Sequence, residues 1–151
     1  MSKEWEEEKE EWRKKIEALT IPEDKVEQLI PKLEHEIDTV YQEASFKYTY
    51  YKSKYENLQD RIKAIKKAYG DEGSNKQERE ANAYRMLMFY PSGEEEDPDA
   101  KNLITLRNNI RKRYYFFRDY VMDNLKTKSN RLSNNIGAAK VSARIEGAYG
   151  S

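Results

Sequence analysis

Apolar residues recur at intervals of three or four from Val26 to Tyr69, in twelve steps that cover 43 residues. An α-helix brings residues at this spacing onto one face, so the pattern predicts a single long helix over residues 23–69. The apolar face is narrow, as in helices that pack along a coiled-coil seam rather than against a wide globular core. The predicted seam consists of Val26, Leu29, Leu33, Ile37, Val40, Ala44, Tyr48, Tyr51, Tyr55, Leu58, Ile62, Ile65 and Tyr69.

Two features bound this helix. Pro31 marks either a kink or the true start of the helix, because proline lacks the backbone N–H and clashes with the preceding turn. Residues 70–75 combine two glycines with polar residues, so we expect the helix to end there.

The remaining segments predict further helices. In the acidic N-terminal segment, residues 1–21, the residues Trp5, Trp12, Ile16 and Leu19 form one helical stripe. We predict a helical core over residues 22–136. It contains the long helix over 23–69 and three further segments. These are a short helix over 76–90, an acidic loop over 91–98 and a long basic helix over 99–134, whose seam is Leu103, Leu106, Ile110, Tyr114, Phe117, Val121, Leu125 and Leu132. Residues 137–151 form a small-residue basic tail that we expect to be flexible.

Composition limits the class of protein. Charged residues make up 37% of the chain and hydrophobic residues also 37%, which favours a thin core between long helices. We therefore predict an all-α protein, an elongated helical hairpin or bundle with coiled-coil-like helices that forms a homo-oligomer. The absence of cysteine excludes disulfides and thiolate sites. No apolar run is long enough for a membrane span, so we expect a soluble cytoplasmic protein.

The net charge of zero is a cancellation between the two ends of the chain. Residues 1–40 carry a net charge of −6, residues 41–97 carry −1, and residues 98–151 carry +7. Such asymmetry indicates either an anionic partner or a self-complementary assembly.

The stretch from Arg107 to Tyr120 contains five cationic and five aromatic residues. This mixture suits single-stranded nucleic acid, because cations contact phosphates while rings stack on bases. At 100° per residue, one flank beside the seam holds Arg107, Arg111, Tyr115 and Arg118. The candidate binding residues are Arg107, Arg111, Lys112, Arg113, Arg118, Lys126, Lys128 and Arg131 for phosphate, and Tyr115 for a base.

Other interpretations of these charges stay open. The cations could pair with acidic residues of 4–36, either within one chain or between chains. The acidic part of the chain, residues 1–38, could also be a solvated face, a contact for a basic partner, or a cover over the basic helix that competes with nucleic acid.

Tyrosines form a second cluster. Tyr48, Tyr51 and Tyr55 belong to the seam, which favours a role in a core or an interface. Tyr41 and Tyr50 point elsewhere, and could stack bases beside neighbouring lysines, which are Lys47, Lys52 and Lys54.

Little in the sequence indicates catalysis. His35 is the single histidine and is flanked by glutamates, whereas metal sites need several converging ligands. One surface histidine cannot support a Ser/His/Asp set, and no glycine-rich phosphate loop is present. We therefore expect a protein that is not an enzyme and has neither a metal site nor a cofactor.

The layout resembles the UvsY-like recombination mediators of phages. The matching features are a long helix ending in K-A-I-K-K-A-Y-G-D-E-G (residues 63–73) and a final helix containing L-R-N-N-I-R-K-R-Y-Y-F-F-R-D-Y (residues 106–120). The helix over 76–90, the acidic loop and the tryptophan-bearing N-terminal segment depart from that pattern. The resemblance implies single-stranded DNA binding by a ring-like oligomer, in the host cytoplasm for a phage protein. It also implies loading of a RecA-like recombinase onto DNA coated with single-strand-binding protein.

Two functional hypotheses follow. The first is a non-enzymatic single-stranded DNA-binding protein of phage or mobile-element recombination or replication, which acts like a mediator. The second is a structural or adaptor coiled-coil oligomer in which acidic and basic segments pair between subunits.

Overall fold

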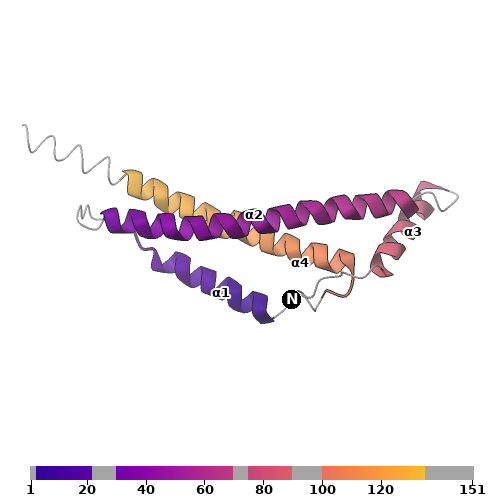
Figure 1. Ribbon diagram of the computed structural model, residues 1–151, viewed down its shortest axis with the longest axis horizontal. Helices are drawn as coiled ribbons and strands as arrows, with labels where there is room; N and C mark the ends of the chain where they lie inside the picture. Colours follow the sequence, from indigo (N-terminus) through magenta and orange to yellow (C-terminus); the bar gives the residue numbers. More distant parts are fainter. Residues whose placement is uncertain (1–2, 22–29, 70–74, 90–99, 135–151) are drawn as a thin grey trace, which may run out of the picture. The chain divides into compact units, whose positions relative to one another are not determined.

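The computed structural model describes residues 3–21, 30–69, 75–89 and 100–134, and in those residues it contains helices and no β-strand (Figure 1). The helices are α1 (Lys3–Ala18), α2 (Ile30–Tyr69), α3 (Lys76–Phe89) and α4 (Leu103–Tyr115), followed by the π-helix η1 (Phe116–Met122). Residues 123–134 are again α-helical. The predicted all-α class is therefore confirmed, whereas the oligomeric assembly stays a prediction.

The chain divides into two compact units, each assembled from parts of several helices. Unit 1 consists of Met1–Glu7 and Lys47–Phe116, and unit 2 consists of Glu8–Phe46 and Phe117–Ser151. Each unit therefore combines segments that are distant in the sequence.

The core of unit 1 consists of buried apolar side chains from α1, α2, α3 and α4. Trp5 of α1 is only 2% exposed. Its ring meets the edges of Tyr51 and Phe116, with ring centroids 6.4 and 5.5 Å away. Burial of such side chains away from water is the main force that holds the unit together. The remaining buried residues include Leu58, Ile62, Ala83, Leu87, Leu103, Leu106 and Ile110.

Unit 2 is organised around the second tryptophan of α1. Trp12 is 5% exposed, and its ring lies 5.3 Å from that of Phe117 in an edge-on arrangement. The other buried side chains of this core include Ile16, Leu19, Ile37, Ala44, Val121, Leu125 and Leu132.

The spacing of apolar residues predicted the buried faces correctly. All four members of the α1 stripe are buried, and the members of the α2 seam from Leu33 to Ile65 are each buried or half-buried. Pro31 is the second residue of α2, a position in the first turn where its missing N–H leaves no helical hydrogen bond unmade. The predicted start of the long helix at residue 23, the acidic loop and the tail lie outside the described residues.

Helix α4 begins at Leu103 rather than near Asp99. Asn102 caps it, because its side-chain Oδ1 accepts hydrogen bonds from the Thr105 backbone N at 2.8 Å and from the Thr105 hydroxyl at 3.0 Å. Such a cap satisfies a backbone N–H that has no partner within the helix.

The π-helix was not predicted. Its hydrogen bonds join residues five apart, so each turn takes up more residues than an α-helical turn. The prediction that Arg118 continues the flank of Arg107, Arg111 and Tyr115 assumed 100° per residue throughout. That assumption was wrong, because η1 begins between Tyr115 and Arg118.

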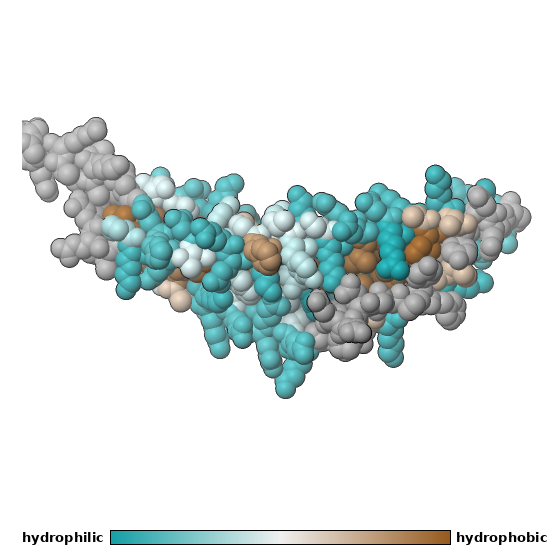
Figure 2. Space-filling view, viewed as in Figure 1, coloured by the Kyte–Doolittle hydropathy of each residue, from teal (hydrophilic) through white to brown (hydrophobic). Residues whose placement is uncertain are grey.

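The face drawn in Figure 2 is mostly hydrophilic, and hydrophobic side chains show only in small areas. This surface agrees with the high proportion of charged residues in the chain. Among the described helices, none has the length and apolar character that a bilayer crossing requires.

Candidate nucleic-acid interface

Four tyrosines of unit 1 form a tyrosine stack, which consists of Tyr48 and Tyr55 from α2 with Tyr114 and Tyr115 from α4. The ring of Tyr114 lies 5.7 Å from that of Tyr48 and 5.6 Å from that of Tyr55, at interplanar angles of 23° and 9°. Tyr48 and Tyr55 are two helical turns apart, so each offers a face to Tyr114. Near-parallel rings at these distances attract one another beyond their burial.

Tyr115 lies at the exposed end of this stack. Its ring is 5.4 Å from Tyr114 and 6.4 Å from Tyr55, in tilted arrangements, and the residue is 38% exposed. The other three tyrosines are half-buried. The stack therefore holds one aromatic side chain in contact with solvent, where an unpaired base can stack on it.

Gln59 links the stack to a cation. Its side-chain Nε2 donates to the Tyr55 hydroxyl at 2.9 Å, and its Oε1 accepts from Arg107 Nη1 at 3.1 Å. Arg107 Nε also donates to Asn108 Oδ1 at 3.1 Å. These bonds fix the half-buried guanidinium of Arg107 between α2 and α4.

Arg113 has a different environment from the one that the sequence predicted. Its guanidinium carbon lies 5.3 Å from the Trp5 ring centroid and 5.9 Å from that of Tyr51. A guanidinium on the faces of two buried rings is a cation–π contact that stabilises the core of unit 1. Arg113 is therefore better explained as a core residue than as a phosphate ligand.

Of the four predicted binding cations in unit 1, Arg111 and Lys112 are the least engaged. Arg111 is half-buried and Lys112 is exposed. Neither side chain forms a hydrogen bond or an ion pair with any residue that the structure describes. Both belong to α4, as does Tyr115, so unit 1 combines two available cations with an exposed ring on one helix.

Two of the predicted binding cations of unit 2, Arg118 and Lys128, have hydrogen-bond partners within that unit. Arg118 donates from Nε and Nη2 to the two carboxylate oxygens of Asp119, at 2.7 and 3.1 Å, and this bidentate bond lowers the pKa of Asp119. Lys128 Nζ donates at 2.6 Å to the Leu19 carbonyl, just beyond the end of α1.

Partial burial lowers the pKa of Lys128, and the nearby charge of Arg131 adds to this effect. Arg131 and Lys126 themselves are exposed.

The structure bears on the idea that acids of the same chain neutralise the basic residues. Between described residues, no ion pair joins an acid to any of six predicted cations, which are Arg107, Arg111, Lys112, Lys126, Lys128 and Arg131. Ion pairs do form elsewhere, for example between Lys15 and Glu43 at 3.1 Å. Pairing between chains, and a cover formed by the acidic segment, stay predictions.

The second tyrosine cluster divides as the sequence predicted. Tyr51 is buried, whereas Tyr41 and Tyr50 are exposed. Lys54 Nζ lies 5.6 Å from the centroid of the Tyr50 ring and 3.5 Å from its hydroxyl. Tyr50 is therefore a second exposed tyrosine of unit 1 that lies beside a cation, and it does not belong to the tyrosine stack.

Sequence reasoning missed Gln59 and the role of Tyr114. Tyr114 was assigned to the seam on its spacing alone. Tyr48 and Tyr55, seven residues apart on one helix, were a signal that a ring from another helix could insert between them. No comparable signal was available for Gln59, because its bonds depend on which helices meet.

The described residues contain no group of three or more His, Cys, Asp or Glu side chains that could hold a metal ion. His35 is exposed on α2. Comparison with protein-family models, with curated proteins and with solved structures found no match to this chain.

Proposed function

We propose that this chain is a non-enzymatic protein that binds single-stranded nucleic acid through the exposed end of the tyrosine stack in unit 1. The observation that carries the proposal is Tyr115, an exposed ring in contact with Tyr114 and Tyr55, on the same helix as Arg111 and Lys112. In this proposal a base stacks on Tyr115 and the two cations hold adjacent phosphates.

The energies of these contacts suit the proposal. Stacking of one base on an aromatic side chain contributes about 1–3 kcal/mol and tolerates any base, because every base has a π-face. Each phosphate contact releases counterions, and the affinity therefore falls as salt increases. Arg107, fixed through Gln59, adds a further positive charge on the same helix, α4.

The resemblance to phage recombination mediators extends the proposal to a biological role. A mediator needs to hold single-stranded DNA while it helps a RecA-like recombinase replace single-strand-binding protein. Several copies of a weak site, joined in a homo-oligomer, would provide the necessary affinity through high effective concentration.

An oligomeric adaptor is the second candidate function. The opposite charges of the two ends of the chain favour it, together with the six cations that lack an acidic partner among the described residues. In this alternative the acidic segment of one copy neutralises the basic helix of another, and nucleic acid is not involved.

Fluorescence anisotropy of a labelled single strand of ~30 nucleotides, titrated at low and at moderate salt with a duplex control, tests the first proposal. We expect tight binding to the single strand that weakens steeply with salt. The double variant Arg111→Glu/Lys112→Glu should abolish binding. The control Lys63→Glu/Arg85→Glu makes the same charge change at two exposed positions of unit 1 outside the tyrosine stack and should retain binding.

Sedimentation of the same variants separates the two functions. Under the nucleic-acid proposal, Arg111→Glu/Lys112→Glu leaves the oligomer intact while binding is lost. Dissociation of the oligomer, without binding by the unaltered chain at low salt, would assign these charges to assembly.

A further inference from the structure

A pocket of about 560 Å³ lies in unit 1 beside the end of α2, outside the tyrosine stack. This volume falls within the range of pockets that hold small ligands, about 300–1,000 Å³. Its lining comprises Lys66 of α2 together with Lys76, Arg79, Glu80, Ala83 and Tyr84 of α3.

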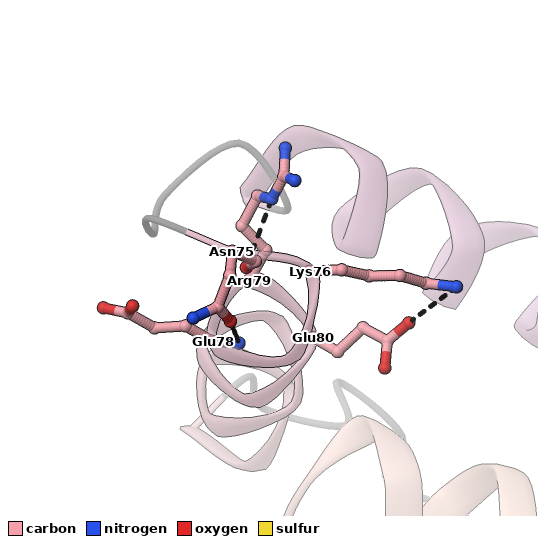
Figure 3. A network of polar contacts seen from close by, with 5 residues as sticks. All are labelled: Asn75, Lys76, Glu78, Arg79 and Glu80. Atoms are coloured by element: carbon pink, nitrogen blue, oxygen red, sulfur yellow. Dashed lines mark hydrogen bonds and ion pairs between the residues drawn. The ribbon is translucent and has the colours of Figure 1, made fainter.

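The beginning of α3 positions the lining side chains. Asn75 caps this helix, since its Oδ1 accepts from the Glu78 backbone N at 2.8 Å (Figure 3). The Asn75 carbonyl accepts from the Arg79 backbone N at 3.0 Å and from its Nε at 3.3 Å. The cap thereby orders the first turn, and the bond from Nε ties the guanidinium of Arg79 to that turn.

Helical periodicity then brings the lining together. Lys76, Glu80 and Ala83 are separated by four and three residues, so they share one face of α3. Arg79 and Tyr84 flank that face, and Lys66 closes the pocket from α2. Ala83 is buried and is short enough to leave space beneath the longer side chains.

Among the described residues that line the pocket, positive charge is in excess. Three cations stand there against one acid, Glu80. Lys76 Nζ lies 4.0 Å from the Glu80 carboxylate, and the two side chains are 87% and 71% exposed, so this pair is weak. An anionic group entering the pocket would meet Lys66, Lys76 and Arg79 at the cost of one weak contact.

The pocket also has an aromatic wall. Tyr84 is 52% exposed and lines the pocket, which leaves ring surface available to a flat ligand. Cations beside an exposed ring match a ligand that carries both a phosphate and an aromatic base.

We propose that this pocket binds a nucleoside phosphate, with its phosphate on Lys66, Lys76 and Arg79 and its base on Tyr84. The ligand is either a free nucleotide or the 5′-phosphorylated end of a strand, since both present the same chemistry. The site does not depend on the proposed binding at Tyr115, and its residues differ from those of that interface.

Calorimetric titration of the full chain with adenosine 5′-monophosphate tests the pocket. We expect binding that weakens at least about tenfold in Lys66→Glu/Arg79→Glu, because two charge-assisted contacts are lost. The matched control Lys67→Glu/Arg85→Glu changes the same charges on the same two helices at positions outside the lining, and should bind like the unaltered chain. Equal affinity in both double variants, or no binding by the unaltered chain, would overturn the proposal.

Comparison of adenosine monophosphate with inorganic phosphate tests the aromatic and the cationic parts of the pocket separately. Tyr84→Ala should weaken adenosine monophosphate but leave inorganic phosphate unchanged, whereas Tyr84→Phe should preserve both. If Tyr84→Ala left the monophosphate unaffected, the aromatic half of the proposal would be wrong. Circular dichroism of each variant verifies that the helices are retained.

Two oligonucleotides that differ only at the 5′ end distinguish the sources of the phosphate. Tighter binding of the 5′-phosphorylated strand than of the 5′-hydroxyl strand, lost in Lys66→Glu/Arg79→Glu, assigns the pocket to strand ends. Equal binding of the two strands assigns it to free nucleotides. Because Arg111→Glu/Lys112→Glu should keep its affinity for adenosine monophosphate, failure at Tyr115 and failure of the pocket are distinguishable.

Discussion

Each unit has a tryptophan of α1 in its core, and the surroundings of the two rings differ. Trp5 and Trp12 both meet a phenylalanine edge-on, and both carry a cation on the ring. On Trp5 the cation is Arg113 at 5.3 Å, and on Trp12 it is Lys15 at 4.6 Å. Lys15 also pairs with Glu43, so its charge is balanced locally. The same arrangement of ring and cation therefore stabilises both cores.

The two units differ more in their exposed aromatic side chains and in the partners of their predicted binding cations. In unit 1 a stack of tyrosines reaches an exposed ring, and Arg111 and Lys112 have no partner among the described residues. In unit 2 Arg118 binds Asp119 and Lys128 binds the Leu19 carbonyl. The comparison teaches that an abundance of cations does not locate a binding surface, because some of the cations stabilise the fold. Because Lys126 and Arg131 of unit 2 are exposed as well, the proposal places the interface in unit 1 on the tyrosine stack rather than on its cations alone.

Replacement of the tryptophans should have the largest effect. Trp5→Ala and Trp12→Ala each should cost about 3–5 kcal/mol of the free energy of unfolding, measured by urea denaturation. We expect Trp5→Ala to be the more severe, since Trp5 is the partner of two rings and Trp12 of one, while each carries a cation. An equal loss in both variants would mean that the contact between Trp5 and Tyr51 contributes little to the core.

Removal of Tyr115, the exposed end of the tyrosine stack, should have the next largest effect. Tyr115→Ala should lower the affinity for a single strand by about 1–3 kcal/mol, because a stacked base loses its platform. Tyr41→Ala removes an exposed tyrosine of unit 2 and should leave the affinity unchanged. A larger loss in Tyr41→Ala than in Tyr115→Ala, measured by anisotropy, would move the interface to unit 2.

The salt dependence sharpens the comparison of the cations. Arg111→Ala/Lys112→Ala should reduce the slope of log affinity against log salt by about 1.4, since each phosphate contact on a single strand contributes about 0.7. Lys126→Ala/Arg131→Ala, in unit 2, should change this slope by less. Anisotropy over a series of salt concentrations measures both, and an equal reduction would show that the two units share the phosphates.

The pH dependence of stability should show the smallest effect, at Lys128. Its folded-state pKa is below the ordinary value of 10.5, so the unfolded chain binds more protons in the alkaline range between the two values. The free energy of unfolding should therefore rise with pH through that range, by less than about 1 kcal/mol because the group is largely solvated. Urea denaturation should show this rise relative to Lys128→Met, and the absence of any difference would mean that the pKa is not lowered.

The sequence predicted the cores better than the surface. Spacing of three and four identified the stripe of Trp5, Trp12 and Ile16 and the seam of α2, because helical periodicity is local in the sequence. It could not predict η1, since whether a turn widens depends on the packing around Phe116 and Phe117. It also could not separate Arg111 from Arg113, because their roles depend on which side chains of other helices lie nearby.

The amide of Gln59 has a consequence for the thermodynamics of binding. A free arginine side chain loses considerable conformational entropy when a ligand immobilises it, and that loss subtracts from the affinity. Arg107 has already lost this freedom on folding, because Gln59 holds it while bonded to Tyr55. A phosphate that reaches Arg107 would thus meet a preorganised donor, and the entropic part of its binding would be less unfavourable than at Lys112.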